Sequence, residues 1–473
     1  MNNHTLWSLR LGFSNEQSKT IEKLGLKDFL DQSFKIKFNA NLPEFLSESP
    51  KSIEDFQALK AEKKLQSQED KMKLLRKEIQ TSFEMKAWWI DKIQDAEFPL
   101  TEKMTCFWHN HFVATFQKVK VNYWIFNHNQ LLRENAFGNF KDLTKMMLKS
   151  NAIVKYLDNV DNKKGKLNEN LSRELLELFT LGIGNYSEQD IKNGAKGLAG
   201  LSIGSNTEAS GAIYRPRFED NESFEYFGKK GNFKIDEMID IIFEQPNIPY
   251  HITRKILKWF IYDNPKEDLV KYYGDYFKQQ NFEIKPLLTK IFIDEFDKKT
   301  AGSKIKNPLE YVLQITNELQ VEKPNSKLIA LFLRQQNMDL FNQPNVKGWI
   351  GGNSWLTSQT YLQRNNTADL LCNGKNFQGR KKLMEDNEPM NSENSNAILK
   401  VNLDFNKSGN NKQIIAELKE RFLFQSDENA QLDFEKILKY DFNLNNEGSH
   451  PETSGAVLRL FNAMVKMPEF QLI

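Results

Sequence analysis

The sequence predicts an all-α protein, a large multi-helix, bundle-like domain with a short loop or β-hairpin excursion near residues 202–231. Apolar residues recur at helical spacing along most of the chain, whereas alternating apolar and polar runs are scarce. With 473 residues, of which 39% are hydrophobic and 27% charged, the chain can bury a large core. We expect an N-terminal helical part (residues 1–201) and a C-terminal helical part (residues 232–473) to pack as one unit.

The first half of the chain carries helix start and stop signals in sequence order. Gly25 follows one apolar pattern as a typical helix C-cap, and Thr101, just after Pro99, can cap another helix. Residues 52–92 contain neither Pro nor Gly and predict one long, Lys/Glu-rich helix. The helices expected here are residues 15–24, 27–30, 52–92, 102–117 and a helical region over 123–157.

The second half begins with a polar turn at residues 158–165. A strongly patterned helix follows over residues 168–180 and ends at Gly182. Ser187 and Asp190 have the spacing of a capping box, with Asp in place of the usual Glu or Gln. Further helices are expected at residues 187–201, 236–243, 250–262 and 267–279, and loops at 202–231, 380–396 and 406–411.

Charge and cysteine content exclude several classes of protein. The 65 Lys and Arg against 63 Asp and Glu leave a net charge of +2, too near balance for a generic nucleic-acid binder. The two cysteines, Cys106 and Cys372, exclude a disulfide framework or a Cys-rich zinc module. The first residues show no cationic region followed by an apolar run, so the sequence predicts a cytoplasmic protein without a transmembrane segment.

The first candidate site is the pair His109 and His111, because imidazoles are common metal ligands. Residues two apart on a helix point about 200° apart, so at most one of them can face a shared metal site. The alternative is that both are packed, hydrogen-bonded histidines in an aromatic core.

The second candidate is the polar face formed by Asn170, Glu174 and Glu177, beside a leucine stripe. Two carboxylates three residues apart resemble half of a di-metal site in a helix bundle. Arg173 can bridge Glu169 and Glu177, which stand four residues away on either side. We therefore expect Glu174 and Glu177 as metal ligands or general base, Arg173 to orient the carboxylates, and Asn170 to hold substrate or water. The alternative is a surface ladder of ion pairs, each contributing about 0.2–0.5 kcal/mol.

Two loops supply candidate residues for binding a substrate or a partner. Arg215 and Arg217 lie in the charged excursion, and Trp349 lies in a glycine-rich loop where the backbone can approach a ligand closely. The alternatives are a solvated charged loop and a loop packed tightly on the core. Walker, Gly-x-Ser-x-Gly, His-Glu-x-x-His and Gly-x-Gly-x-x-Gly motifs are absent from the sequence, which disfavours the common enzyme classes that carry them.

Six segments carry a family resemblance, at residues 107–112, 168–182, 186–191, 305–310, 345–352 and 468–471. They resemble the corresponding segments of a bacterial family called domain of unknown function 1800. The resemblance covers the chain from about Leu9 onward. It implies a helical protein, often encoded beside an exported phosphatase- or sulfatase-like protein. Many relatives carry export signals, so an exported or periplasmic location is the alternative to the cytoplasm.

The chain departs from the pattern of this family at three places. Glu219-Asp220 stands where relatives often have His-Asp, Phe224 where a Lys is expected, and Phe179 where many relatives have His. A metal or anion held at those positions would be bound differently here.

The leading functional hypothesis is a metal-assisted hydrolase of a polar or anionic substrate, which would use a divalent metal. The competing hypothesis is a non-catalytic binding or assembly partner of an exported phosphatase- or sulfatase-like protein. In that case the polar helix face is a buried network satisfied internally. The two hypotheses differ in whether Asn170, Arg173, Glu174 and Glu177 reach an open cavity.

Overall fold

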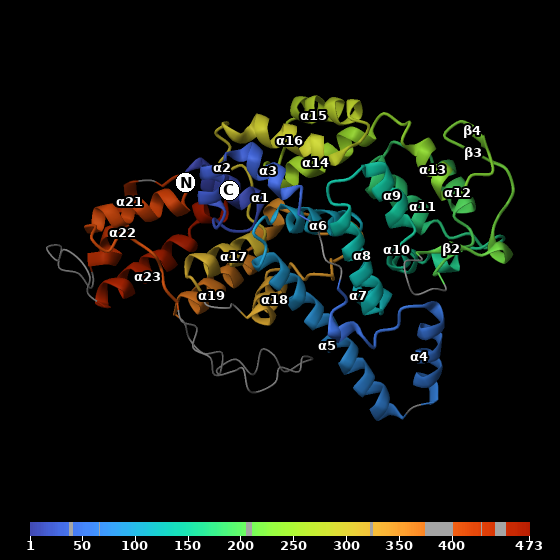
Figure 1. The fold of residues 1–473 in the computed structure, drawn as a ribbon, viewed down its shortest axis with the longest axis horizontal. Helices are drawn as coiled ribbons and strands as arrows, with labels where there is room; N and C mark the ends of the chain where they lie inside the picture. Colours follow the sequence, from blue (N-terminus) through green and yellow to red (C-terminus); the bar gives the residue numbers. More distant parts are fainter. Residues whose placement is uncertain are drawn as a thin grey trace.

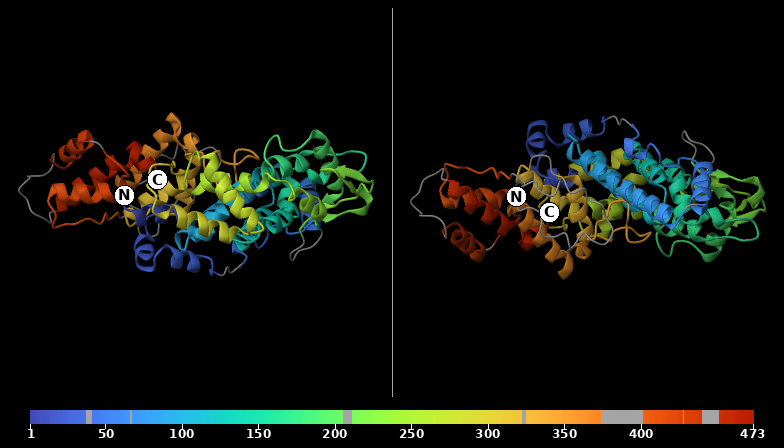
Figure 2. Two further views of the ribbon diagram at one scale, coloured as in Figure 1. Left: turned by 90° about the horizontal axis from the view of Figure 1, so that it is seen from above. Right: turned by 90° about the horizontal axis from the view of Figure 1, so that it is seen from below.

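The computed structural model describes residues 1–36, 41–65, 67–204, 211–321, 325–373, 401–426, 428–439 and 451–473. It is an elongated, almost entirely helical molecule, in which the only strands of the described residues form two small two-stranded sheets (Figures 1 and 2). The helices α21–α23 form one end and the strands β3 and β4 the other (Figure 1). The predicted fold class is thus confirmed.

The N-terminal segment contributes three short helices, the helix α4 at the edge of the molecule (Figure 1), and the long helix α5, whose second half is buried in the core at Met85, Trp89 and Ile90. Residues 52–92 do not form one helix as expected, because a new helix starts after Ser67, whose side chain accepts the Asp70 N–H. No Gly or Pro marks this break in the sequence. The helices are α1 (Asn3–Leu11), α2 (Ser18–Leu24), α3 (Leu26–Ser33), α4 (Ile53–Leu65) and α5 (Gln68–Gln94), with a 3₁₀ turn η1 (Glu44–Leu46).

Helix α6 (Leu100–His111) is central, since all its residues except Asn110 are buried. It ends earlier than the expected residue 117, because Phe112 leaves the helical region with φ −100° and ψ 72°. The expected helical region 123–157 divides into three helices. The elements that follow α6 are α7 (Phe116–Val119), α8 (Asn122–Glu134), α9 (Phe140–Leu148), α10 (Asn151–Tyr156) and the 3₁₀ turn η2 (Asn159–Asp161).

The patterned helix over residues 168–180 changes its winding halfway. It begins as α11 (Asn170–Glu174) and continues as the π-helix η3 (Leu175–Thr180). π-Helical turns are rare and occur frequently at functional sites. Helix α12 (Glu188–Gly197) follows with the predicted capping box of Ser187 and Asp190, which is confirmed.

The excursion consists of two short hairpin-like ladders. Strand β1 (Leu201–Ser202) pairs antiparallel with β2 (Ile213–Tyr214), and β3 (Phe224–Tyr226) pairs antiparallel with β4 (Lys229–Gly231), with a 3₁₀ turn η4 (Pro216–Phe218) between them. The expected hairpin is present, at one end of the molecule (Figure 1).

The C-terminal half is helical again and returns to the N-terminus. The buried cluster of Leu6, Leu9 and Ile473 joins the two ends of the chain, which lie side by side in Figures 1 and 2. The expected loop at residues 380–396 lies outside the described residues. The helices are α13 (Ile235–Ile242), α14 (Ile248–Phe260), α15 (Glu267–Gln279), α16 (Ile284–Phe296), α17 (Pro308–Glu318), α18 (Ser326–Gln335), α19 (Ser358–Asn373), α21 (Asn411–Phe422), α22 (Glu428–Lys439) and α23 (Pro451–Val465), with 3₁₀ turns η5 (Gly352–Leu356) and η8 (Pro468–Gln471).

One continuous cluster of buried apolar residues runs from Trp7 to Phe470 and surrounds α6. Among the described parts of the chain, no helix is both long and apolar enough to cross a lipid bilayer. Buried polar residues are unusual in such an apolar core, so they are the first candidates for a functional site.

Candidate functional site

A cavity of about 410 Å³ lies beside α6, between η3, α14 and two loops. Aromatic and aliphatic side chains form much of its wall, and basic side chains interrupt it. The lining residues are Phe107, Asn110 and His111 of α6; Glu177, Leu178, Gly182 and Ile183 of η3 and the turn after it; His251, Lys255, Lys258, Trp259 and Asp263 of α14 and the turn after it; and Lys304, Ile305, Asn307, Lys347, Trp349–Gly352 and Trp355 of the loops.

An amine and an imidazole meet at the wall of this cavity. The Nζ of Lys255 lies 3.1 Å from Nδ1 of His111 and donates to the carbonyl oxygen of Leu178 at 2.9 Å. The Nε2 of His111 lies 3.1 Å from the carbonyl oxygen of Phe179. A carbonyl oxygen only accepts, so Nε2 carries the proton of the ring and Nδ1 accepts from Lys255.

The π-helix η3 provides the acceptors for this pair. The carbonyls of Leu178 and Phe179 fall in its last turn, where C=O groups have no partner inside the helix. The oxygen of Leu178 accepts from Lys255 and also from Nε2 of His251 at 3.2 Å. The end of the π-helix thus orients three nitrogen-bearing side chains at the cavity.

Burial favours the uncharged forms of these nitrogen groups. It lowers the pKa of Lys255 from its ordinary value of 10.5 to about 7. Burial, assisted by the Lys255 charge, lowers the pKa of His251 to about 3 and brings the pKa of His111 well below its ordinary value. Both imidazoles are therefore neutral at pH 7, and about half of the Lys255 amine is free base.

Glu177 is the carboxylate of η3 that lines the cavity. It accepts a hydrogen bond from the Tyr186 hydroxyl at 3.0 Å. Glu174, one turn earlier, is partly buried but is not part of the cavity wall. Burial, and then the neighbouring Glu177 charge, raise the pKa of Glu174.

The glycine-rich loop is hydrogen-bonded to α6 through Asn110, the one residue of that helix that is not buried. Asn110 Oδ1 accepts from the Trp349 backbone N–H at 2.6 Å, and its Nδ2 donates to the Trp349 carbonyl at 3.2 Å. Gly348 has φ +74°, and a Cβ there would lie 2.5 Å from the Asn110 carbonyl oxygen. Glycine is needed at this position because any side chain would push the loop off the helix.

Two tryptophans of the wall carry unpaired donors. The indole N–H groups of Trp259 and Trp349 are buried and have no hydrogen-bond partner among the described residues. A buried donor without a partner costs about 1–3 kcal/mol.

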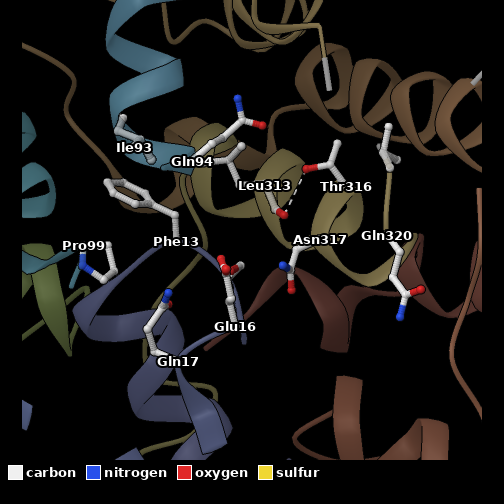
Figure 3. Close-up of a pocket in the computed structure, with 12 residues that line it drawn as sticks. Phe13, Glu16, Gln17, Ile93, Gln94, Pro99, Leu313, Thr316, Asn317 and Gln320 are labelled. Carbon is white, nitrogen blue, oxygen red and sulfur yellow. Dashed lines mark hydrogen bonds between the residues drawn. The ribbon is translucent and has the colours of Figure 1, made fainter. Parts of the chain in front are cut away.

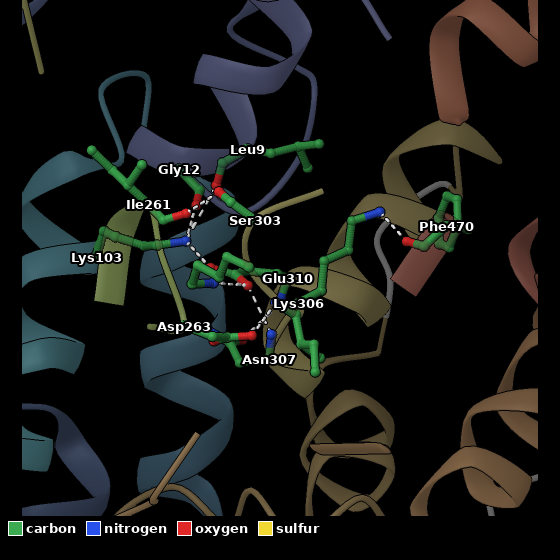
Figure 4. Close-up of polar contacts among 12 residues, drawn as sticks. Leu9, Gly12, Lys103, Ile261, Asp263, Ser303, Lys306, Asn307, Glu310 and Phe470 are labelled. Carbon is green, nitrogen blue, oxygen red and sulfur yellow. Dashed lines mark hydrogen bonds and ion pairs between the residues drawn. The ribbon is translucent and has the colours of Figure 1, made fainter. Parts of the chain in front are cut away.

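Lys103, Lys304 and Glu310 form a buried charge cluster next to the cavity (Figure 4 shows Lys103 and Glu310). Lys304 belongs to both the cluster and the cavity wall. Glu310 caps α17 at Asn307 and accepts ion pairs from Lys103 and Lys304. Burial alone would raise the pKa of Glu310, but the two ammonium groups lower it to about 2. Glu310 balances one of these two positive charges, and its contacts fix the loop that bears Lys304, Ile305 and Asn307.

A second hollow, of about 280 Å³, lies between the N-terminal segment, α5 and α17 (Figure 3). Its wall consists of amide and apolar side chains, and Glu16 is the only charged residue in it. It contains none of the residues that the sequence pointed to, and it lacks the basic and aromatic groups of the first cavity.

Three of the residues expected to form a site are brought together. His111, Glu177 and Trp349 all line the central cavity, although they come from three distant parts of the sequence. Trp349 is 5% exposed and packs its backbone on α6, so its loop both packs on the core and lines a cavity.

His109 lies elsewhere in the core. Its Nε2 is 3.3 Å from the Ala114 carbonyl and its Nδ1 is 3.3 Å from the amide of Asn129. Burial, and then the nearby His128, bring its pKa well below the ordinary value. Both nitrogens of His109 are engaged, as in the packed-histidine alternative.

Arg173 does not bridge Glu169 and Glu177 as expected. It pairs with Glu169 at 3.2 Å and with Glu188 at 3.0 Å, because Glu188 stands at the start of α12 beside it. Asn170 is exposed and is not part of the cavity wall. This end of the helix is the surface ladder of ion pairs, while the Glu177 end reaches the cavity.

The arginines of the excursion also lie away from the cavity. Arg215 donates to the Ile203 carbonyl at 2.9 Å, and Arg217 is exposed, with its guanidinium 5.4 Å from the ring of Phe218. Within the described ranges, no group of three or more His, Cys, Asp or Glu side chains converges as a metal ion requires.

Sequence reasoning missed the contribution of α14. His251, Lys255, Lys258 and Trp259 follow one another at i, i+4, i+7 and i+8, and all four line the cavity. This spacing places them on one helix face, so the signal was present in the sequence. It was missed because an amphipathic helix with lysines is usually a solvated one.

The chain matches no curated protein and no solved structure. It does match one family model over residues 4–472, described as protein of unknown function (DUF1800). The motifs at residues 107–112, 168–182, 305–310 and 345–352, which carried the resemblance, each contribute residues to the central cavity. The chain is therefore a member of the DUF1800 family, matched over nearly its whole length.

Proposed function

We propose that this protein is an enzyme that acts on a small organic anion bound in the central cavity, with Lys255 and His111 as its proton-transfer pair. The observation that supports this most is the Lys255 amine, which opens on a cavity and donates to an imidazole instead of a carboxylate. A group poised near neutral pH is suited to general acid–base work.

The charge of the wall favours an anion. Lys258 and Lys347 are exposed at the cavity and have no ion pair among the described residues, and Lys255 adds a third amine. The wall also contains two carboxylates, Glu177, which accepts from the Tyr186 hydroxyl, and Asp263, which accepts from the Ile305 backbone N–H at 2.9 Å. These neutral donors leave the carboxylate charges in place, so the anion preference rests on the exposed position of Lys258 and Lys347.

The walls favour an organic ligand over an inorganic ion. Trp259, Trp349 and Trp355 supply broad apolar surfaces, which bind rings and hydrocarbon segments by dispersion and burial. The cavity volume of about 410 Å³ lies in the range of small-molecule sites.

The metal-assisted hydrolase expected from the sequence stays a prediction. His111 and Glu177 share the cavity, but both ring nitrogens of His111 already contact protein groups. A metal ligand at Nδ1 would have to displace Lys255.

Calorimetric titration with phenyl phosphate, benzoate and neutral phenol tests the proposed ligand class. We expect the two anions to bind at least tenfold more tightly than phenol. The double variant Lys258→Gln/Lys347→Gln should remove most of this preference. Arg217→Gln, a basic residue remote from the cavity, is the matched control and should change nothing. Equal affinity for anions and phenol would contradict the proposal.

Hydrolysis of p-nitrophenyl acetate, phosphate and sulfate tests the reaction class. Turnover that Lys255→Met abolishes and EDTA leaves intact would support proton transfer by the pair. Turnover that requires added Zn²⁺ or Mn²⁺ and is lost in Glu177→Gln would instead support the metal-assisted reaction.

A second candidate function, docking of an exported phosphatase- or sulfatase-like protein, is favoured by one observation. Ile183 and Ile350 are 71% and 75% exposed, and both line the same cavity. Exposed aliphatic side chains at a cavity favour contact with another molecule. A pull-down with that partner, comparing wild type with Ile183→Glu/Ile350→Glu, separates docking from ligand binding by the cavity interior.

A further inference from the structure

The surroundings of Lys255 differ from those of Lys103 and Lys304, two buried lysines that pair with Glu310. Lys103 donates to the carbonyls of Leu9 and Gly12 and pairs with Glu310, so all three of its protons have acceptors (Figure 4). Lys304 lines the cavity but holds both oxygens of Glu310. These two lysines share one carboxylate partner.

Lys255 has two acceptors, His111 Nδ1 and the Leu178 carbonyl, and neither is charged. A neutral amine has two N–H bonds and one electron pair. If both N–H bonds serve these acceptors, the electron pair takes the remaining tetrahedral direction and faces neither acceptor. Since Lys255 lines the cavity, a ligand there can approach this electron pair.

We propose that Lys255 is a nucleophile that forms an imine with its substrate, which is therefore an organic anion bearing an aldehyde or ketone group. This inference rests on the proposed function and specifies its substrate class and its chemistry. An amine that is desolvated in an apolar pocket is the usual nucleophile for such a reaction.

The neighbouring imidazole supplies the proton transfers that imine formation needs. The Nζ electron pair attacks the carbonyl carbon, a C–N bond forms, and the C=O π electrons move to oxygen. A first proton passes from nitrogen to His111 Nδ1 and then to the oxygen, which gives the neutral carbinolamine, and the second nitrogen proton follows the same route to its hydroxyl group. Water leaves with the C–O electron pair, and the nitrogen electron pair forms the C=N bond. One amine and one carbonyl give one imine and one water, without an oxidant or reductant.

The basic rim explains why the carbonyl compound should be an anion. Lys258 and Lys347 can hold a carboxylate or phosphate while the carbonyl end reaches Lys255. Lys258 is three residues from Lys255 on the same helix, so the two side chains lie on one helix face. The anionic group of the ligand would contact Lys258 while its carbonyl carbon contacts Lys255.

Reductive trapping tests the inference. The wild type is incubated with glyoxylate and sodium cyanoborohydride, and the adduct is located by mass spectrometry of peptides. We expect one adduct per chain, on Lys255, with a rate that rises through about pH 7 because the free amine is the reacting form. Surface lysines should react at least tenfold more slowly at this pH.

Two variants separate a nucleophile from a structural lysine. Lys255→Arg should lose the adduct, whereas Lys278→Arg, a change to an exposed lysine of α15 outside the cavity wall, should keep it. Lys255→Cys should be unreactive until 2-bromoethylamine alkylates the thiol and restores an amine at that position. Cys106 and Cys372 are buried and have raised thiol pKa values, so they should not be alkylated. Rescue of trapping would exclude a purely structural role.

The titration with benzoate and phenyl phosphate distinguishes the two proposals. If those anions bind but glyoxylate is trapped on surface lysines only, the imine inference is wrong and the anion site stands. If the anions do not bind either, both proposals fail. Trapping that persists unchanged in Lys255→Arg would also overturn the inference.

Discussion

Replacing Lys255 by methionine should stabilise the fold while it abolishes the chemistry. The two side chains are similar in length and volume, so Met fits without leaving a large cavity. Burial lowers the pKa of Lys255 from 10.5 to about 7, which means that the folded state disfavours the ammonium form. At about 1.4 kcal/mol for each tenfold change in the equilibrium, this corresponds to about 5 kcal/mol when the amine is protonated.

Part of this gain is offset by a lost hydrogen bond. Methionine cannot donate to His111 Nδ1, and a buried acceptor left without a donor costs about 1–3 kcal/mol. The Leu178 carbonyl keeps its bond from His251. The expected net increase in the free energy of unfolding is therefore about 2–4 kcal/mol at pH 6.

The gain should depend on pH in a defined direction. Below pH 7 Lys255 is protonated in both the folded and the unfolded chain, so the wild type bears the full penalty. As pH rises from 7 to 10.5 the folded amine is neutral, and the stability that this group contributes increases. The advantage of Lys255→Met should shrink over this range and reverse between about pH 8 and 10, where the remaining burial penalty of about 1–3 kcal/mol equals the cost of the lost hydrogen bond.

Urea denaturation of wild type and variant at pH 6 and pH 10 measures this difference. Lys258→Met is the matched control, because Lys258 is exposed on the same helix and should change the free energy of unfolding by less than about 0.5 kcal/mol. Destabilisation by Lys255→Met of the same size at both pH values would refute the reasoning, since it would mean that the folded protein holds the ammonium form favourably.

Two further predictions concern the frame of the cavity. Gly348→Ala should lower the free energy of unfolding by about 2–3 kcal/mol in thermal denaturation and weaken anion binding, because a Cβ there meets α6. Gly184 has a similar positive φ but open space around it, so Gly184→Ala should cost only about 1 kcal/mol. Equal costs for the two variants would contradict the packing argument. Glu310→Gln should cost about 3–5 kcal/mol at pH 7, because it strands the ammonium groups of Lys103 and Lys304. The pKa of Glu310 is lowered to about 2, so the wild type should lose this contribution as pH falls from 4.5 to about 2, and denaturation at pH 3 should show a smaller difference between the two proteins.

The helical fold was predictable because apolar periodicity and capping chemistry are local properties of the sequence. The capping box of Ser187 and Asp190 needs only the residues it contains, and the structure confirms it. The break at Ser67 and the π-helix η3 were not predictable in this way. Neither is marked by Gly or Pro, and the winding of η3 is coupled to groups that pack on it from α6 and α14.

The site was predictable in part. His111, Glu177 and Trp349 were singled out because an imidazole, a carboxylate and an indole are conspicuous in apolar or glycine-rich surroundings. Arg217 was singled out because it lies in the charged excursion, which could bring side chains over a pocket, but it is not part of the cavity wall. Residue type and spacing identify candidates, but which of them share a cavity depends on contacts between segments far apart in the sequence.

Lys103 and Lys255 show what that dependence means for function. Both lie on helices, and burial lowers the pKa of each, to about 8 and about 7. The carboxylate that neutralises Lys103 is Glu310, 207 residues away, whereas the acceptors of Lys255 are an imidazole 144 residues away and a carbonyl 77 residues away. A lysine paired with a carboxylate has its protons committed and serves the fold. A lysine that donates to neutral acceptors at a cavity keeps its reactive free-amine form at neutral pH. Burial is common to Lys103 and Lys255, so the chemical identity of the distant partner decides which role each of them has.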